Sequence, residues 1–269
     1  MDLVRTELRE QGVVELTLCD PDRRNAMTEA MGHAIAEQMN ALVEDPSLRA
    51  VVLTGAGHAF SAGGDLAMIE SMARQGSSHP GDETRREISE FMRRFYGLYL
   101  SVRDLPCPTI AALNGAAMGA GLCIALACDT RIAARDAKLG LNFTRLGIHP
   151  GMGATWTLPR IVGPAHAAEL LYTGRILEGA EAERIGLVNR AVDAEAVLPE
   201  ALEMARAMAL SAPGAVRGTK QALAHSLDTD LAGQLDFEAH QQSLCYESAD
   251  LGEGLAAARE KRPPRFRGN

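Results

Sequence analysis

Two short glycine-rich stretches constrain the fold of this chain more than any other feature. They cover residues 59–66 and 114–121. Each follows a run rich in apolar and β-branched residues, 51–54 and 109–113, and each precedes an apolar pattern with helical spacing. The sequence therefore predicts the order strand, small-residue loop and helix start twice, which is typical of an α/β protein.

Loops of this kind can place two main-chain amides against one ligand oxygen. Small residues let a ligand approach the backbone closely. A helix start adds N–H groups that have no intrahelical partner and lie at the positive end of the helix dipole. Two converging amides are what the stabilisation of an oxyanion requires. The alternative interpretation is a pair of tight turns that serve only packing.

Length and charge narrow the class of protein. The chain has 269 residues and a formal net charge of −8, which is long enough for one large domain with an appendage. The negative charge argues against a nucleic-acid-binding protein. No uninterrupted apolar run reaches about 18 residues, so we expect no membrane span. The N-terminal residues lack the apolar core of a signal peptide, which predicts a cytoplasmic protein.

Cysteines, histidines and missing motifs exclude several chemistries. The five cysteines form no C-x-x-C pair, which predicts reduced thiols in the core. The seven histidines are scattered singly, so we expect no metal site. Motifs for a P-loop, a zinc protease and a serine hydrolase are absent, and neither G-x-G has the third glycine of a dinucleotide fingerprint.

Local patterns predict the elements before residue 150. A hairpin is expected around residues 10–12, and Thr28 is the expected cap of a helix that ends near residue 44. The apolar side of that helix should consist of Met31, Ile35, Met39, Leu42 and Val43. The patterns also predict strands at 50–54, 129–134 and 138–140, and helices at 65–74, 83–103 and 119–128. The polar segment 75–82 predicts a mobile loop, either a plain surface loop or a gate over a substrate.

The last third of the chain changes to helical patterns. They extend from about residue 194 to residue 260, with breaks at 211–214 and near Gly252. We therefore divide the chain into a core with the ligand site, residues 1–193, and a helical region, residues 194–269, which packs on the core or on a neighbouring subunit. The basic tail 261–267 is either a solvated end or a contact for phosphate.

A set of short motifs, in a fixed order, extends over nearly the whole length. The first two are Asp-Pro-Asp-Arg-Arg-Asn-Ala-Met at 20–27 and Phe-Ser-Ala-Gly-Gly-Asp-Leu at 60–66. The others lie at 108–115, 119–121, 128–129, 146–155, 159–163, 173–175, 182–188 and 260–262. In this order and spacing, the chain resembles the enoyl-CoA hydratase/isomerase (crotonase) family.

This resemblance implies a fold, a ligand and an assembly. The fold would be an α/β, crotonase-like spiral of ββα repeats with a C-terminal helical trimerisation region. The protein would form homotrimers, often paired into hexamers. The ligand would be an acyl-CoA thioester, with coenzyme A as part of the substrate and no separate cofactor.

By position, the resemblance also implies roles for residues of both loops. The backbone N–H groups of Ala62 and Ala120 would bind the thioester oxygen. Other residues would contact the coenzyme A moiety: Arg24 and Ala26 along the nucleotide, Gly63, Gly64, Asp65 and Leu66 on the adenine and pantetheine side, and Lys261, from the same or a neighbouring subunit, at a phosphate.

Three positions depart from the family pattern. Typical hydratases of this family carry two glutamates that hold and activate water, and here these positions are Cys123 and Phe143. A third position, an aspartate in some branches, is Gly151. None of the three is a carboxylate, although a positioned acid or base contributes about 10²–10⁴-fold to a rate.

Two residues are candidates for the missing chemistry. Cys123 is either a nucleophile or a core thiol, and the apolar helix around it favours the core thiol. His149 precedes Pro150 and Gly151 in a loop that borders the acyl end in this family, so it is either a proton shuttle or an ordinary loop histidine. Phe143 and Trp156 either narrow the acyl pocket or belong to the core.

The sequence leaves several functions open. The leading hypothesis is an enzyme that acts on an acyl-CoA through an enolate-like intermediate, for which the family default is hydration of a 2-enoyl-CoA. Isomerisation, decarboxylation or hydrolysis by another residue, such as His149, is an alternative. So is a non-catalytic acyl-CoA-binding protein, or a scaffold whose helical tail serves assembly.

Overall fold

The chain begins with the predicted hairpin. In the computed structural model, which describes residues 2–268, β1 (Val4–Leu8) pairs antiparallel with β2 (Val13–Leu18). The 3-10 turn between them (Glu10–Gly12) has positive φ angles at Gln11, 62°, and Gly12, 74°. The hairpin is the edge of a larger sheet.

The larger sheet has the strand order β1-β2-β3-β5-β7-β10. From β2 onward every neighbouring pair is parallel. The added strands are β3 (Ala50–Gly55), β5 (Thr109–Leu113), β7 (Thr130–Ala134) and β10 (Arg190–Val192). Buried residues fill β3 and β5 completely, which is typical of strands covered on both faces.

A second, smaller sheet is formed mainly by strands that directly follow those of the larger sheet along the chain. Its order is β4-β6-β8-β9, with β4 (Ala59–Ser61), β6 (Ala116–Met118), β8 (Lys138–Gly140) and β9 (Ile176–Glu178). Each of β4, β6 and β8 follows a strand of the larger sheet and precedes a helix. The chain therefore repeats the unit strand, strand, helix, and the predicted spiral of ββα repeats is confirmed.

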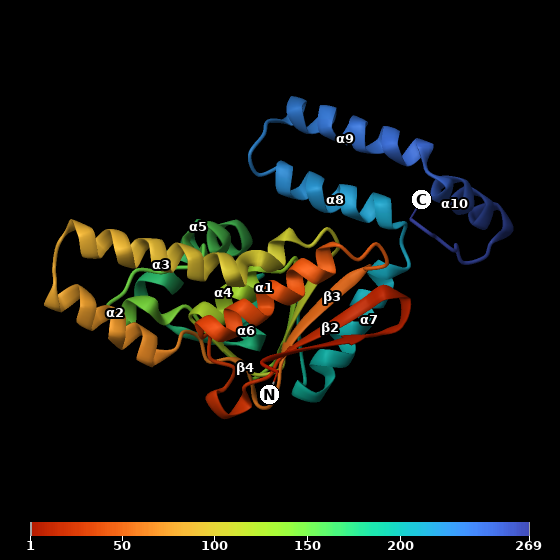
Figure 1. Cartoon of the computed structure of the whole chain (residues 1–269). Coiled ribbons are helices and arrows are strands. Elements are labelled where there is room, and N and C mark those ends of the chain that lie inside the picture. Colours follow the sequence, from red (N-terminus) through yellow and green to blue (C-terminus); the bar gives the residue numbers. More distant parts are fainter. Residues whose placement is uncertain (1, 269) are drawn as a thin grey trace.

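Two long helices pack on each other beside the larger sheet (Figure 1). α1 (Glu29–Val43) begins at Thr28, whose Oγ1 accepts a hydrogen bond from the Met31 N–H at 3.1 Å. α3 (Asp82–Leu100) continues into a 3-10 turn (Ser101–Asp104), and its Tyr99 hydroxyl donates to the Thr28 carbonyl at 2.6 Å. Met31, Ile35 and Met39 are buried as predicted, but Val43 is exposed.

The predicted mobile loop at 75–82 is wrong. α2 (Leu66–Ser78) continues through its first half, and α3 begins at Asp82, so residues 79–81 alone connect the two helices. Packing of the helix pair explains the difference. Gln75 donates to Glu87 at 2.9 Å, and Ile88 of α3 lies beside Gly76, its Cδ1 3.7 Å from where a Cβ would be. These contacts offset the low helix propensity of Gly76.

The remaining core helices surround the small sheet. α4 (Ala120–Ala127) is buried along its whole length. A 3-10 segment (Asn142–Leu146) leads to α5 (Ala154–Thr173), which is kinked at Gly163 with φ 76°. Short elements complete the core: a 3-10 turn (Pro21–Arg23), α6 (Gly179–Arg184) and a 3-10 turn (Ala194–Ala196).

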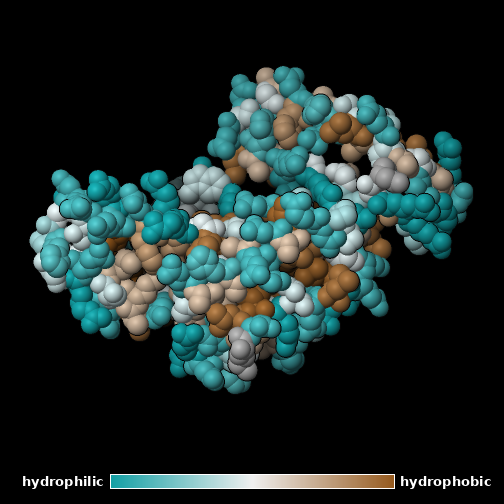
Figure 2. Space-filling view, in the orientation of Figure 1, coloured by the Kyte–Doolittle hydropathy of each residue, from teal (hydrophilic) through white to brown (hydrophobic). Residues whose placement is uncertain are grey.

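The C-terminal region has two parts. α7 (Val197–Ala209) packs on the larger sheet, with Ala201 and Ala205 fully buried. α8 (Pro213–His225), α9 (Leu231–Glu247) and α10 (Ala249–Glu260) form a lobe that stands off the core, as Figure 1 shows, and Figure 2 shows hydrophobic residues among the hydrophilic ones on its visible face. The division at residues 193 and 194 stays a prediction, but α7 belongs structurally with the sheet.

The breaks between these helices differ from the predicted ones. The break at 211–214 is confirmed, because α8 begins at Pro213. Gly252 lies inside α10, and the break falls at Ser248 instead, whose Oγ accepts from the Asp250 N–H at 3.1 Å. A further break at 226–230 separates α8 from α9. No helix within residues 2–268 is long and apolar enough to cross a membrane.

Candidate active site

Asn25 holds the first glycine loop in place. Its side-chain amide donates to the carbonyls of Ala56 and Ala59, both at 2.9 Å, and its own carbonyl accepts from the Ser61 hydroxyl at 2.7 Å. Asn25 is fully buried and has a positive φ of 53°. The motif at 20–27 is thus bound to the loop at 59–66, although about 35 positions separate them.

The two glycine loops lie against each other. Gly63 has a φ of 94°, and a Cβ at this residue would clash with the carbonyl oxygen of Met118 and lie 3.6 Å from the nitrogen of Ala120. Gly119 precedes α4 with φ 49° and ψ −119°, a conformation that other residues rarely adopt. Glycine is therefore required at Gly63 by the close approach of the loops, and at Gly119 by the backbone conformation.

Ala62 does not have the free amide that the resemblance implies. Its N–H donates to the carbonyl of Arg24 at 2.8 Å. In the same loop, the N–H of Gly63 donates to the Ser61 hydroxyl at 3.2 Å, and the N–H of Asp65 donates to the Met27 carbonyl at 3.3 Å. The prediction of Ala62 as an amide donor to a ligand is corrected, because its hydrogen bond to the protein is already made.

Two other amides remain available. Within residues 2–268, neither the N–H of Gly64 nor that of Ala120 has a protein acceptor. Gly64 is half-buried, and Ala120 is the first residue of α4, where the N–H has no intrahelical partner. Gly64 and Ala120 thus provide two amides, one from each of these adjacent loops, that can bind a ligand oxygen.

Cys123 is a core thiol. It is 1% exposed, and its Sγ lies 3.7 Å from the carbonyl oxygen of Gly151. Burial raises the pKa of Cys123 to about 12. A thiol with this pKa is not a nucleophile near neutral pH. Within residues 2–268, Cys107 and Cys128 are buried as well, while Cys19 and Cys245 are partly exposed, and all five thiols are free.

An aromatic ring and an amide lie over Gly119. The Phe143 ring tip would be 3.9 Å from a Cβ at Gly119, and the Asn142 Oδ1 would be 3.6 Å from it. Both side chains come from the 3-10 segment that precedes α5. The position of the second family glutamate therefore holds a phenyl ring at the edge of the glycine loops.

Tyr96 is a residue of the site that the sequence did not reveal. Its hydroxyl packs against Gly151, where a Cβ would clash with the oxygen and lie 2.8 Å from Cζ. Burial, and to a lesser degree the neighbouring Cys123, raise the pKa of Tyr96. The available signal was a polar tip in the apolar stripe of α3, since Met92 and Tyr96 are four residues apart and both pack against the core.

Of the other predicted site residues, most lie in or beside the first loop and one lies far from it. Arg24 and Ala26 lie beside the first loop, through the bond from Ala62 to Arg24 and that from Met27 to Gly63. Asp65 caps α2, its Oδ1 accepting from the Ala67 N–H at 2.9 Å, and Leu66 is exposed. Within one chain, Lys261 ends α10 in the C-terminal lobe, far from α2 (Figure 1).

His149 is exposed and makes a local contact. Its Nδ1 lies 2.7 Å from the carbonyl oxygen of Pro150, the next residue. This contact leaves Nε2 open to solvent. Within residues 2–268, no group of three or more His, Cys, Asp or Glu side chains that could hold a metal ion occurs.

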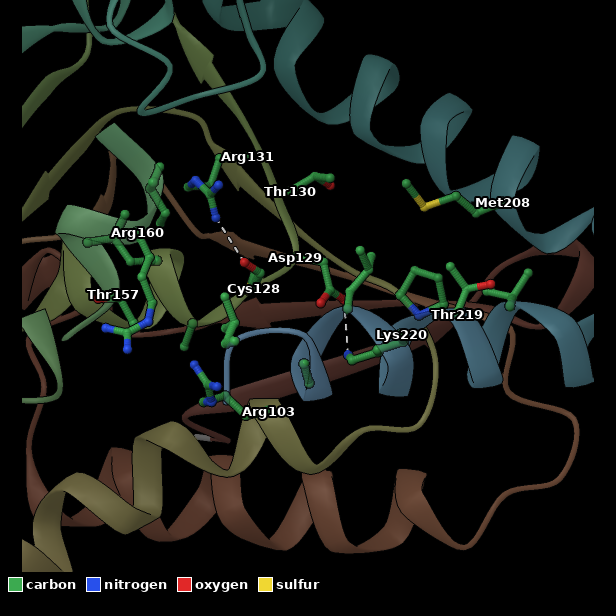
Figure 3. Close-up of a pocket in the computed structure, with 18 of the residues that line it drawn as sticks. Arg103, Cys128, Asp129, Thr130, Arg131, Thr157, Arg160, Met208, Thr219 and Lys220 are labelled. Atoms are coloured by element: carbon green, nitrogen blue, oxygen red, sulfur yellow. Dashed lines mark hydrogen bonds and ion pairs between the residues drawn. The ribbon is translucent and has the colours of Figure 1, made fainter. Parts of the chain in front are cut away.

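A separate cavity of about 650 Å³ lies between the core and α8 (Figure 3). Trp156 lines it, with the guanidinium groups of Arg103 and Arg160 at 5.0 Å and 4.1 Å from the ring centre. On the other side, Lys220 pairs with Asp129 at 3.0 Å and donates to the Cys107 carbonyl at 2.8 Å. The cavity borders the C-terminal end of α4, whereas the free amide of Ala120 is at the other end. Trp156 thus lies in this cavity, partly exposed.

Comparisons with known proteins agree with one another. Residues 8–269 match the sequence model of the family described as enoyl-CoA hydratase/isomerase. The chain is 38% identical over 267 residues to the bovine enoyl-CoA hydratase domain-containing protein 2, mitochondrial, covering 96% of this chain and 85% of the relative. It is 35% identical over 259 residues to a crotonyl-CoA hydratase of Syntrophomonas wolfei, covering 96% of this chain and 95% of the relative.

Solved structures give the same result. An enoyl-CoA hydratase from Bacillus anthracis superposes with a TM-score of 0.88 at 35% identity, covering 99% of this chain and 100% of the other. A protein from Mycobacterium abscessus, described as a putative enoyl-CoA hydratase/isomerase, superposes with a TM-score of 0.90 at 29% identity, with coverage of 99% and 100%.

Proposed function

Because the chain belongs to the enoyl-CoA hydratase/isomerase family, we propose that it is an enzyme that binds an acyl-CoA thioester and stabilises an enolate-like form of it. The amides of Gly64 and Ala120 bind the thioester oxygen. The observation that carries this proposal is the pair of free N–H groups in two loops that touch. Amides fixed in this way stabilise charge as it develops on an oxygen.

The coenzyme A moiety lies along the first loop in this proposal. Arg24 is exposed and Ala26 half-buried beside the loop, and Gly63, Gly64, Asp65 and Leu66 form the loop itself. The guanidinium of Arg24 suits a phosphate. Coenzyme A enters and leaves as part of the substrate.

Assembly and location are further parts of the proposal. We propose that the C-terminal lobe joins copies of the chain into a homotrimer or hexamer. Lys261 then contacts a phosphate of the coenzyme A that is bound to a neighbouring subunit. Support comes from large apolar side chains that the lobe leaves exposed: Leu223, Leu227, Leu231, Leu235, Leu244 and Tyr246. We also propose a cytoplasmic location, although several similar proteins are named as mitochondrial.

Ala120→Pro tests the oxygen-binding amides. Proline is tolerated at the first position of a helix and removes the N–H. We expect acetyl-CoA labelled with ¹³C at its carbonyl to show a lower carbonyl stretching frequency when bound to the unchanged protein than in water. In Ala120→Pro this shift should shrink, and any turnover should fall about 10²–10³-fold. Ala120→Ser keeps the amide and is the matched control.

The result that contradicts the proposal is an unshifted carbonyl frequency in the unchanged protein at saturating acetyl-CoA. Crotonyl-CoA, followed by the loss of its conjugated absorbance, tests the family default reaction. Tight binding without turnover of enoyl, 3-enoyl and malonyl-type thioesters would instead identify a non-catalytic acyl-CoA-binding protein. Loss of turnover in His149→Ala would assign the acid–base chemistry to that histidine. An unchanged rate would exclude His149 as a catalytic residue.

A further inference from the structure

The hydroxyl of Tyr96 points to the place where the family has its acid–base groups. Its phenol end packs against Gly151, and Gly151 lies 3.7 Å, carbonyl oxygen to Sγ, from Cys123. Both of these positions are carboxylates in other branches of the family, according to the resemblance. A side chain at Gly151 would displace the tyrosine. Gly151 therefore leaves the space that the Tyr96 hydroxyl occupies.

The Tyr96 hydroxyl has no partner within the described chain, residues 2–268. Tyr99, less than one turn further along α3, shows the contrast, because its buried hydroxyl donates to the Thr28 carbonyl at 2.6 Å. The Tyr96 oxygen is unpaired but not fully buried. It is thus a half-buried hydroxyl that the protein itself does not use as a hydrogen-bond donor.

Helix geometry relates this hydroxyl to the free amide of Ala120. Ala120 and Cys123 are three residues apart in α4, so they are separated by about 4.5 Å along the helix axis. Tyr96 lies at the Cys123 end of that turn, and the free amide lies at the Ala120 end. A thioester whose oxygen binds the amide would present its α-carbon in the direction of the phenol.

The groups around this point favour one reaction class. Addition of water to an enoyl thioester calls for a base, and Cys123, Phe143 and Gly151 supply none. Loss of CO₂ from a 2-carboxyacyl thioester needs no base. It needs a hydrogen-bond donor for the thioester oxygen, a site that strips water from the carboxylate, and an acid that protonates the resulting carbanion.

We propose that Tyr96 is a catalytic proton donor and that the substrates are 2-carboxyacyl-CoA thioesters of the malonyl type, which the site decarboxylates. This inference rests on the proposed function. The bond between Cα and the carboxylate carbon breaks, CO₂ leaves, and the electron pair forms an enolate whose oxygen the amides of Gly64 and Ala120 bind. The Tyr96 O–H bond then breaks, its proton goes to Cα, and water returns a proton to the phenolate.

The state of the phenol suits this role. Burial and the neighbouring Cys123 raise the pKa of Tyr96 above its ordinary value. The hydroxyl is therefore protonated at neutral pH and does not repel an incoming carboxylate. Transfer of its proton to the carbon of a thioester enolate is downhill, because the enolate is a far stronger base than a phenolate.

The test compares Tyr96→Phe with the unchanged protein on malonyl-CoA, methylmalonyl-CoA and ethylmalonyl-CoA. Tyr96→Phe removes one oxygen and keeps the ring, and Tyr172→Phe, at an exposed tyrosine of α5, is the matched control. We expect the unchanged protein to release the acyl-CoA and CO₂. Tyr96→Phe should lower kcat about 10²-fold or more, with KM changed only a few-fold. Tyr172→Phe should leave both constants unchanged.

Stereochemistry gives a second readout that a structural role would not move. In D₂O, methylmalonyl-CoA should yield propionyl-CoA with deuterium in one configuration at Cα. Tyr96→Phe should yield a mixture, because water would then protonate either face. Equal rates and equal configuration in both proteins would overturn the role of Tyr96.

The two proposals can fail separately. Binding of acetyl-CoA with a shifted carbonyl frequency, but no decarboxylation of any of the three substrates, would overturn the decarboxylase and leave the thioester site standing. No binding of acetyl-CoA would overturn both. The binding measurement is therefore made on the same sample as the rate measurement.

Discussion

Gly63 and Gly64 are adjacent in the first loop, yet the structure demands glycine at only one of them. Gly63 has a φ of 94°, and a Cβ there would meet the Met118 carbonyl. At Gly64 the nearest atom to such a Cβ is Ile69 Cδ1 at 3.4 Å, an ordinary contact. The need for glycine therefore comes from the second loop, which presses on Gly63 alone.

Gly63→Ala should destabilise the protein much more than Gly64→Ala. The positive φ alone costs about 1–3 kcal/mol, and the clash with Met118 adds to this cost. Gly64→Ala should change the free energy of unfolding by about 1 kcal/mol or less. Urea unfolding followed by circular dichroism measures both. Equal midpoints for the two variants would contradict the close approach of the loops.

Single residues also show what the sequence could and could not predict about the site. The resemblance gave Cys123, Phe143 and Gly151 as positions of family carboxylates, and the structure brings Phe143 near Gly119 and Gly151 near Cys123. Ala62 was wrong. Backbone amides carry no residue signature, and the Arg24 carbonyl, 38 positions away, decides which amide is free. Tyr96 was missed, because a polar tip in the apolar stripe of α3 does not by itself show that the hydroxyl packs against Gly151.

At the scale of elements, α1 depends on a cap that the sequence predicted. The Oγ1 of Thr28 accepts from Met31, and the Thr28 carbonyl accepts from Tyr99 of α3. Thr28 thus fixes the start of α1 and joins it to a second helix. The second of these bonds uses the Thr28 backbone and survives any substitution of the Thr28 side chain.

Thr28→Ala should lower the free energy of unfolding by about 1 kcal/mol, within the range of 0.5–2 kcal/mol for lost caps. Thr28→Ser keeps the oxygen acceptor and should lose less than half of that amount. Thermal and urea unfolding of the two variants give the comparison. If Thr28→Ser were as unstable as Thr28→Ala, packing of the methyl group rather than the cap would account for the loss.

Element boundaries were predicted well where packing agrees with local propensity and poorly where it does not. The hairpin, α1 and the strands β7 and β8 were found because apolar spacing and turn residues agree. The segment 75–82 was read as a loop from its glycine and serine residues, but α3 packs on it and extends α2. Gly252 was read as a break, although the serine cap four residues earlier sets the start of α10.

On the scale of the whole molecule, the C-terminal lobe is tied to the core by polar contacts to backbone carbonyls. Lys220 donates to Cys107, Arg217 donates to Leu48 at 3.3 Å, and Arg49 donates to Arg267 at 3.2 Å. The last of these brings the C-terminal tail back to the start of β3. The sequence predicted a helical appendage but not this return, because the contact joins residues more than 200 positions apart.

Two carboxylates hold the returning tail. Glu253 accepts from both terminal nitrogens of Arg262, at 2.6 and 2.9 Å, and from the Arg265 N–H at 2.7 Å. Asp250 accepts from the N–H groups of Arg267 and Gly268, at 2.7 and 2.8 Å. The basic tail, for which a solvated end was one interpretation, is therefore a fixed segment. The guanidinium of Arg262 is engaged within the chain.

Protonation of Glu253 should release this tail. The hydrogen bond from Arg262, helped by the Arg265 N–H, lowers the pKa of Glu253 from 4.5 to about 2. A lowered pKa means that the carboxylate stabilises the folded tail above about pH 4.5, and that this contribution is lost as the pH falls towards 2. Hydrogen exchange at the Arg265 amide, corrected for intrinsic rates, should therefore lose protection across that range. Glu253→Ala should lack this protection already at pH 6. Full protection of the Arg265 amide in Glu253→Ala would show that other contacts hold the tail.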